Sequence, residues 1–151
     1  MIVGVISDTH GLLRPEAVAL LRGVDHILHA GDIGRPGIVE RLAEIAPVTA
    51  IRGNVDTGDW ALAYPERTTV ELGGHRILML HDVQGLQARD CEGGVGVVVS
   101  GHSHKPSQKA EAGVLFLNPG SAGRRRFRLP VTLALMDLGP GPPTARIVEI
   151  A

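Results

Sequence analysis

Seven side chains able to bind a metal ion occur at five places along this 151-residue chain. They are Asp8, His10, Asp32, Asn54, His81, His102 and His104. In an extended chain, residues two positions apart point to the same side, so Asp8 with His10 and His102 with His104 could each approach one cation. The residue types and their spacing therefore indicate a metal site.

Two carboxylates, four imidazoles and one amide oxygen are too many ligands for one ion. A tetrahedral zinc site takes three or four protein ligands, whereas two ions bridged by a carboxylate accommodate about seven. Two divalent cations and two aspartates leave a charge of about +2, or about +1 after a bridging hydroxide, which attracts a phosphate anion. The sequence thus predicts a dinuclear centre whose bridging hydroxide attacks phosphorus in a small phosphoester. Nitrogen and oxygen ligands favour Mn, with Fe, Co, Ni or Zn as alternatives, over Mg or Ca.

Each of these five places lies at the end of a short apolar run, of the kind that forms strands buried on both faces. The runs cover residues 2–6, 26–30, 47–51, 76–80 and 95–99. In open α/β sheets, ligands bind beyond the carboxyl ends of the strands. We therefore expect all five places to meet in one crevice.

Helix-length segments at 15–22 and 36–46 separate the first three runs, and each has a proline near its start. The resulting β-α-β-α-β pattern predicts parallel strands with crossover helices. Gly73-Gly74 between 68–72 and 76–80 predicts a hairpin, and further strands are expected at 114–117, 131–137 and 145–150. The expected fold is a mixed α/β sandwich in which residues 1–151 form one domain.

Composition excludes several classes of protein. With 15 basic and 16 acidic residues the formal net charge is -1, which argues against a nucleic acid as a stable partner. The single cysteine, Cys91, excludes a disulfide framework and fits a reducing cytoplasm. The first strand has no basic leader before it, and no apolar run approaches the roughly 20 residues that span a bilayer. We therefore expect a cytoplasmic protein with no membrane partner.

Five motifs, taken together and in order, resemble those of the calcineurin-like metallophosphoesterases. They are Asp8-x-His10, Gly31-Asp32, Gly53-Asn54, His81 and Gly101-His102-x-His104. The resemblance runs from residue 2 to about residue 123, where Asn118-Pro119-Gly120-Ser121 is similar to a segment of the small single-domain bacterial and archaeal phosphodiesterases. It implies a four-layer sandwich of two mixed β-sheets flanked by helices.

The resemblance also implies a distribution of the ligands. One ion would be bound by Asp8, His10, Asp32 and His104. The other would be bound by Asp32, Asn54, His81 and His102, so that Asp32 is the bridge. By the same analogy Asn54 touches a phosphate oxygen, and Asp56 orients neighbouring groups during catalysis.

The sequence departs from the family pattern at two positions. Many members have a histidine after the Gly-Asn pair that could protonate the leaving group, but here Val55 occupies that position. The small phosphodiesterases commonly lack this histidine as well. Asp82 follows His81 where glycine is usual, and we hypothesise that its carboxylate supports the metal ligands.

Two further segments allow more than one interpretation. The run Arg124 to Arg128 is either a solvated loop or a phosphate contact, with Arg124 as the expected substrate clamp. Trp60 and Tyr64 could stack on a substrate base or anchor a homo-oligomer interface. His29 lies within a buried run, and we interpret it as a structural histidine.

The sequence thus predicts a metal-dependent phosphoric ester hydrolase, and a phosphodiesterase in particular. A phosphomonoesterase that acts on nucleotides or phosphoproteins is one alternative. The other is a non-catalytic scaffold similar to the retromer scaffold subunit, which keeps much of the same fold. The presence of all seven expected ligands counts against the scaffold.

Overall fold

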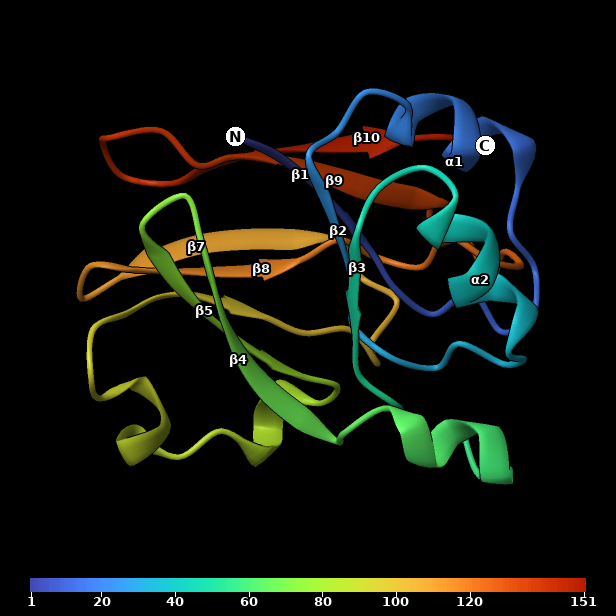
Figure 1. The fold of residues 1–151 in the computed structure, drawn as a ribbon, viewed down its shortest axis with the longest axis horizontal. Helices are drawn as coiled ribbons and strands as arrows, with labels where there is room; N and C mark the ends of the chain where they lie inside the picture. The colour runs from blue at the N-terminus through green and yellow to red at the C-terminus, as the bar shows by residue number, and fades with distance from the viewer.

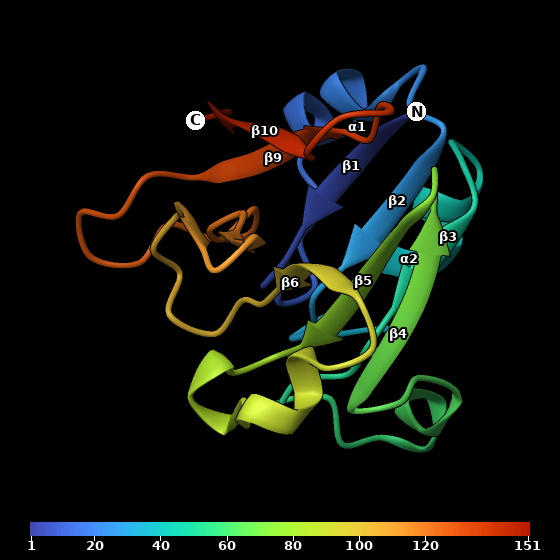
Figure 2. The same cartoon turned by 90° about the vertical axis from the view of Figure 1, so that its left-hand side faces the viewer.

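A computed structural model describes residues 1–151 as two five-stranded sheets that pack face to face (Figures 1 and 2). The first sheet has the order β10 (Thr144–Glu149), β9 (Thr132–Asp137), β1 (Ile2–Ile6), β2 (His26–His29), β3 (Val48–Ala50). The second has the order β4 (Arg67–Leu72), β5 (His75–Leu80), β6 (Val95–Val99), β8 (Val114–Asn118), β7 (Ser107–Glu111).

Both sheets are mixed. In the first, β1, β2 and β3 are parallel, and β9 and β10 extend the sheet as antiparallel strands. In the second, β5, β6 and β8 are parallel, while β4 and β7 pair antiparallel at the two edges. Each sheet therefore has three adjacent parallel strands, at one side of the first sheet and in the middle of the second, and their carboxyl ends reach the same edge of the sheet.

Two α-helices cover the outer face of the first sheet (Figure 1). Helix α1 (Pro15–Leu21) starts with Pro15, whose missing N–H costs nothing in the first turn, and buries Ala17, Val18 and Leu21. Helix α2 (Gly37–Ala43) buries Ile38 and Leu42. These side chains pack on the outward-facing residues of β1 and β2, among them Ile6 and Ile27.

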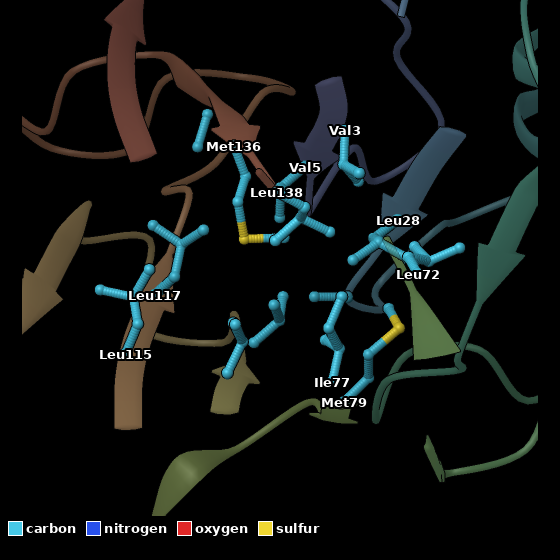
Figure 3. Close-up of a cluster of buried hydrophobic side chains, with 14 of the residues drawn as sticks. Val3, Val5, Leu28, Leu72, Ile77, Met79, Leu115, Leu117, Met136 and Leu138 are labelled. Atoms are coloured by element: carbon cyan, nitrogen blue, oxygen red, sulfur yellow. The ribbon is translucent and has the colours of Figure 1, made fainter. Parts of the chain in front are cut away.

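The main core fills the space between the two sheets (Figure 3). Val3 and Val5 of β1 and Leu28 of β2 meet Ile77 and Met79 of β5 there, and all five are buried. Burial of apolar side chains from both sheets provides the dominant stabilisation of such a sandwich.

The outer face of the second sheet is covered more thinly. Leu78, Leu80, Val95 and Val98 form a small buried cluster, against which Leu86 packs from the segment after β5. That segment contains two short 3₁₀ helices, η2 (Val83–Gly85) and η3 (Ala88–Cys91). The predicted α/β sandwich of two mixed sheets is therefore confirmed, with α-helices on one outer face and 3₁₀ turns on the other.

The predicted elements lie within a few residues of the observed ones. The first and fifth apolar runs coincide with β1 and β6. Helix α2 is shorter than the predicted 36–46, and β7 was not predicted. All five residues of β7 are exposed, so this edge strand lacks the apolar pattern from which a strand is predicted. None of the helices is long and apolar enough to cross a membrane.

Candidate metal centre

The loops that follow β1, β2 and β6 hold their metal-capable residues in an unusual backbone conformation. Seven residues other than glycine have a positive φ, and five of them are predicted ligands. These five are Asp8, His10, Asp32, His102 and His104, with φ between 46° and 71°. Each such residue costs on the order of 1–3 kcal/mol, a strain that clusters at functional sites because the surrounding structure maintains it.

The structure brings six of the seven predicted ligands into two adjacent groups. Asp8, His10 and His104 form one group, and Asp32, His81 and His102 form the other. Within each group the candidate ligand atoms lie within 4.8 Å of one another. Asn54, the seventh, lines a pocket together with His81 and His102.

Hydrogen bonds fix the orientation of the Asp8 carboxylate. Its Oδ2 accepts from the Ser7 hydroxyl at 2.6 Å and from the backbone N–H of His102 at 3.1 Å. Its Oδ1 is 3.4 Å from Nε2 of His104 and 3.7 Å from Nε2 of His10. One oxygen is thus used for positioning, and the other faces the imidazoles.

Asp32 and His81 are oriented in the same way. Oδ1 of Asp32 accepts from the backbone N–H of Val55 at 3.1 Å, which leaves Oδ2 directed at the histidines. Nδ1 of His81 donates to the carbonyl of Ala30 at 2.7 Å, so its Nε2 lies 3.1 Å from Asp32 Oδ2. A backbone carbonyl that holds one ring nitrogen and presents the other is a common support for a metal-binding histidine.

Four buried side-chain atoms have no hydrogen-bond partner, and all four belong to these groups. They are Oδ1 of Asp8, Nε2 of His10, Nε2 of His81 and Nδ1 of His104. A buried polar atom without a partner costs about 1–3 kcal/mol. A cation would satisfy such atoms, so the donor set fits bound metal.

The pKa shifts of Asp8, Asp32 and His81 also indicate that the two ligand groups favour a positive charge between them. Burial would raise the pKa of Asp8, but His10, His104 and Ser7 hold it well below its usual value. Burial is likewise outweighed at Asp32, whose pKa is lowered by His81. The pKa of His81 is raised to about 9 because the Asp32 carboxylate and the Ala30 carbonyl outweigh burial, which alone would lower it. Both carboxylates are therefore ionised and face a point where positive charge is stabilised.

Two glycines allow the loops to approach the carboxylates. A Cβ on Gly53 would collide with Oδ1 of Asp32, and a Cβ on Gly101 would lie 2.5 Å from Oδ2 of Asp8. These glycines belong to the Gly-Asn and Gly-His motifs. Their absent side chains let the Asn54 and His102 loops lie directly against the two aspartates.

His29 connects the loop that carries Asp8 to the loop that carries Asp32. It is fully buried, and burial lowers its pKa to about 4, so the ring is neutral. Its Nδ1 accepts from the backbone N–H of Gly31 at 3.1 Å, so its Nε2–H donates to the Thr9 hydroxyl at 3.0 Å. That hydroxyl donates to the carbonyl of Ile33 at 2.9 Å. The expected structural role of His29 is thus a bridge between the Asp8 and Asp32 loops.

Asp56 is buried and does not face the pocket. Its carboxylate accepts from the backbone N–H groups of Ile33 at 3.0 Å, Gly34 at 2.9 Å and Gly53 at 2.8 Å. It joins the loop that carries Asp32 to the loop that carries Asn54. This geometry supports positioning rather than contact with a reacting group.

The Asn118 to Ser121 segment connects the remaining loops. Nδ2 of Asn118 donates to the carbonyl of Gly101 at 2.9 Å and to the Ser103 hydroxyl at 3.2 Å. The Ser121 hydroxyl donates to the carbonyl of Asp8 at 3.0 Å. The motif therefore fixes the histidine loop against the first aspartate loop.

A pocket of about 430 Å³ opens beside the second group. It is lined by Arg52, Gly53, Asn54, Glu66, Arg67, Leu80, His81, Asp82 and His102. Asn54 is exposed there and free to contact a ligand. Neither Arg52 nor Arg67 is among the predicted site residues, although Arg52 lies directly before the Gly-Asn motif.

Other predicted residues lie outside this pocket. Arg124 is exposed and does not line it, although the preceding Gly123 packs against the Thr9 carbonyl. Trp60 lies in the 3₁₀ helix η1 (Asp59–Ala63), and Tyr64 directly follows it. Their ring centroids are 6.4 Å apart, and both side chains pack against the apolar cluster under α1 and α2. Neither aromatic ring stands free on the surface.

Comparison with known proteins establishes the family. Residues 1–140 match the model of the calcineurin-like phosphoesterase superfamily domain. A probable metallophosphoesterase of Methanothermobacter thermautotrophicus is 36% identical over 147 residues, covering 89% of this chain and 85% of that protein. The chain therefore belongs to the calcineurin-like phosphoesterase superfamily, a membership that implies divalent metal ions.

Solved structures share the fold over its whole length. A structure described as a novel archaeal phosphodiesterase has a TM-score of 0.80 and 22% identity, covering 98% of this chain and 100% of that one. Wild-type Vps29 from Entamoeba histolytica, solved with Zn²⁺, has a TM-score of 0.75 and 23% identity, covering both chains completely.

Proposed function

We propose that the protein is a metal-dependent phosphodiesterase with a dinuclear centre. One ion would be bound by Asp8, His10, Asp32 and His104, and the other by Asp32, Asn54, His81 and His102. The observation that carries the proposal is the convergence of four buried, unpartnered polar atoms in two adjoining ligand groups.

The substrate would lie in the pocket beside Asn54. When bound, two divalent ions acidify a water and neutralise charge on the phosphoryl oxygens. The Asn54 amide, exposed at the pocket, would donate a hydrogen bond to a phosphate oxygen. Arg52 and Arg67 place positive charge along the same wall. Hydrolysis of a diester consumes one water and yields a monoester and an alcohol.

The protein's own hydrogen bonds would keep this arrangement fixed during the reaction. Asp56 holds the Asn54 loop against the Asp32 loop, and Ser7 holds Asp8. Such preorganisation is the main contribution that a protein makes to charge stabilisation at a phosphoryl group. Asp56 is therefore a positioning residue.

A diester rather than a monoester is favoured by the open pocket and by the modest charge of its wall, where Glu66 and Asp82 offset the two arginines. The fold shared with the archaeal phosphodiesterase adds support. Manganese is our first expectation for the metal, since the ligands mix nitrogen and oxygen.

The test is bound metal per chain by elemental analysis, together with hydrolysis of bis(p-nitrophenyl) phosphate and p-nitrophenyl phosphate in manganese buffer. Wild type should bind about two ions and prefer the diester, and Asp32→Asn should lose both properties. Asp59→Asn, an exposed carboxylate on η1, is the matched control. Preference for the monoester would favour the phosphomonoesterase.

The scaffold alternative draws on the shared fold with Vps29. Fold alone does not determine function, because unrelated activities occur on one fold. Bound metal without turnover of either ester would favour the scaffold over the enzyme.

A further inference from the structure

The loop after the Asn118 to Ser121 segment carries a solvent-exposed aromatic ring, that of Phe127. Phe127 is 93% exposed, more than any other large hydrophobic residue of the chain, and its φ is 54°. The loop is held in place around it, since Leu129 N–H donates to the carbonyl of Arg126 at 3.1 Å and Arg125 donates to the carbonyls of Leu129 and Ala151. A positive φ is rare for a residue with a bulky side chain, so the loop holds the Phe127 ring outward at a cost in free energy.

This loop also contains the densest run of basic residues in the chain. Residues 112–136 contain four arginines and no carboxylate. Arg124, Arg126, Arg128 and the nearby Lys105 are exposed and form no salt bridge. The whole chain has a net charge of -1, so positive charge is concentrated here.

The aromatic ring and the cations share one pocket. It measures about 760 Å³ and is lined by Ser103, Lys105, Phe127, Arg128 and Leu129. Ser103 lies between the two predicted ligands His102 and His104, and its hydroxyl accepts from the backbone N–H of Lys105 at 3.2 Å. The pocket therefore begins at the metal-binding loop.

We propose that this pocket binds the nucleoside part of a small nucleotide phosphodiester. The base stacks on Phe127, and a second phosphate pairs with Lys105 and Arg128, while the scissile phosphate lies at the metal centre. An exposed aromatic ring beside arginines suits a base next to a phosphate, because every base has a π-face and stacking needs no further partner. The few cations of this pocket suit a short ligand rather than a polymer. The proposal rests on the proposed phosphodiesterase activity.

The first experiment compares two chromogenic diesters with the same leaving group, thymidine 5′-(p-nitrophenyl phosphate) and methyl p-nitrophenyl phosphate. Wild type should prefer the thymidine ester in kcat/KM by about tenfold, the scale of one stacked base, and mainly through KM. Phe127→Ala should reduce that ratio to about one, and Phe127→Tyr should restore it. Leu62→Ala, another exposed apolar residue, should keep the wild-type ratio.

A second comparison adds a 3′-phosphate to the thymidine ester. This phosphate should lower KM about threefold to tenfold in wild type, and Lys105→Gln should remove the gain. Arg22→Gln, an exposed cation at the end of α1, is the control and should retain it.

The outcomes separate the two proposals. Hydrolysis of both esters with equal efficiency, or a preference that survives Phe127→Ala, would overturn the nucleoside pocket and leave the phosphodiesterase intact. Hydrolysis of neither ester by the metal-loaded protein would overturn both.

Discussion

The two groups of predicted ligands differ in their access to water. Side chains of the first group are closed off, with exposed fractions of 0% for Asp8, 6% for His104 and 17% for His10. In the second group Asp32 and His81 are similarly enclosed, but His102 is 47% exposed and faces the pocket that Asn54 also lines.

The difference suggests a division of work between two otherwise similar groups. In both, one carboxylate oxygen is fixed by a backbone N–H and the other faces histidines. The enclosed group is suited to hold an ion permanently, whereas the open group is suited to exchange ligands with a substrate. Four variants test this contrast.

The largest effect is expected for Asp8→Asn. This change removes the charge of a fully buried carboxylate whose Oδ1 lies between His10, His81 and His104. Both groups should lose metal, and diester hydrolysis should fall about 1,000-fold, which corresponds to several kcal/mol of charge stabilisation. Elemental analysis and steady-state kinetics measure the two effects. Retention of two ions would show that the enclosed group is not the anchor.

His102→Ala should have a smaller effect. The enclosed group does not contain this side chain, so one ion per chain should remain while activity falls about 100-fold. His75→Ala is the control. His75 forms a hydrogen bond with the carbonyl of Gly139 and belongs to neither ligand group, so this variant should keep both ions. Loss of both ions in His102→Ala would show that the groups bind metal as a single unit.

His29→Gln tests the bridge between the groups through pH. His29 has a pKa of about 4 when folded and 6.5 as its reference value, so the unfolded chain binds its proton first as the pH falls. The contribution of the neutral His29 ring to the free energy of unfolding is therefore fully present above pH 6.5. It decreases as the pH falls towards 4, by about 3 kcal/mol in total. Urea unfolding of metal-free protein at pH 7 and pH 4.5 should show a larger loss for wild type than for His29→Gln. Equal losses would contradict the neutral, buried ring.

Asp82→Asn should have the smallest effect. Oδ2 of Asp82 lies 3.7 Å from Nε2 of His102, and both side chains are nearly half exposed, so water screens the pair. Asn keeps the oxygen that accepts from the N–H of Gln84. We expect unchanged metal content and a twofold to threefold change in kcat/KM. No change at all would end the hypothesis that this carboxylate supports the metal ligands.

The strands and the convergence of the ligands could be predicted from the sequence because they depend on local pattern. Apolar runs such as 2–6 mark buried strands, and parallel strands present their carboxyl ends at one edge. The polar strand β7 could not be predicted in this way. Its residues bury nothing, and pairing with β8 alone defines it.

The supporting contacts were harder to predict for a different reason. Asp56 and His29 act through groups that lie far away in sequence, such as the backbone N–H of Ile33 and the Thr9 hydroxyl. Residue type does not reveal such partners. Arg52 and Arg67 come together only because the end of β3 and the start of β4, which belong to different sheets, lie at the same pocket.

The position of β1 within its sheet also sets the time at which the centre can form in the cell. Ile2 pairs with Asp137 of β9, and the Asp8 loop is tied to Ser121 and Ala122. A ribosome that adds about 5–20 residues per second makes β9 roughly 7–27 seconds after β1. Until then β1 lacks a neighbour on one side, and the loop bearing the first ligands is supported only from the side of β2. We therefore expect the first sheet to close around the loop of the first ligands only after β9 has been translated.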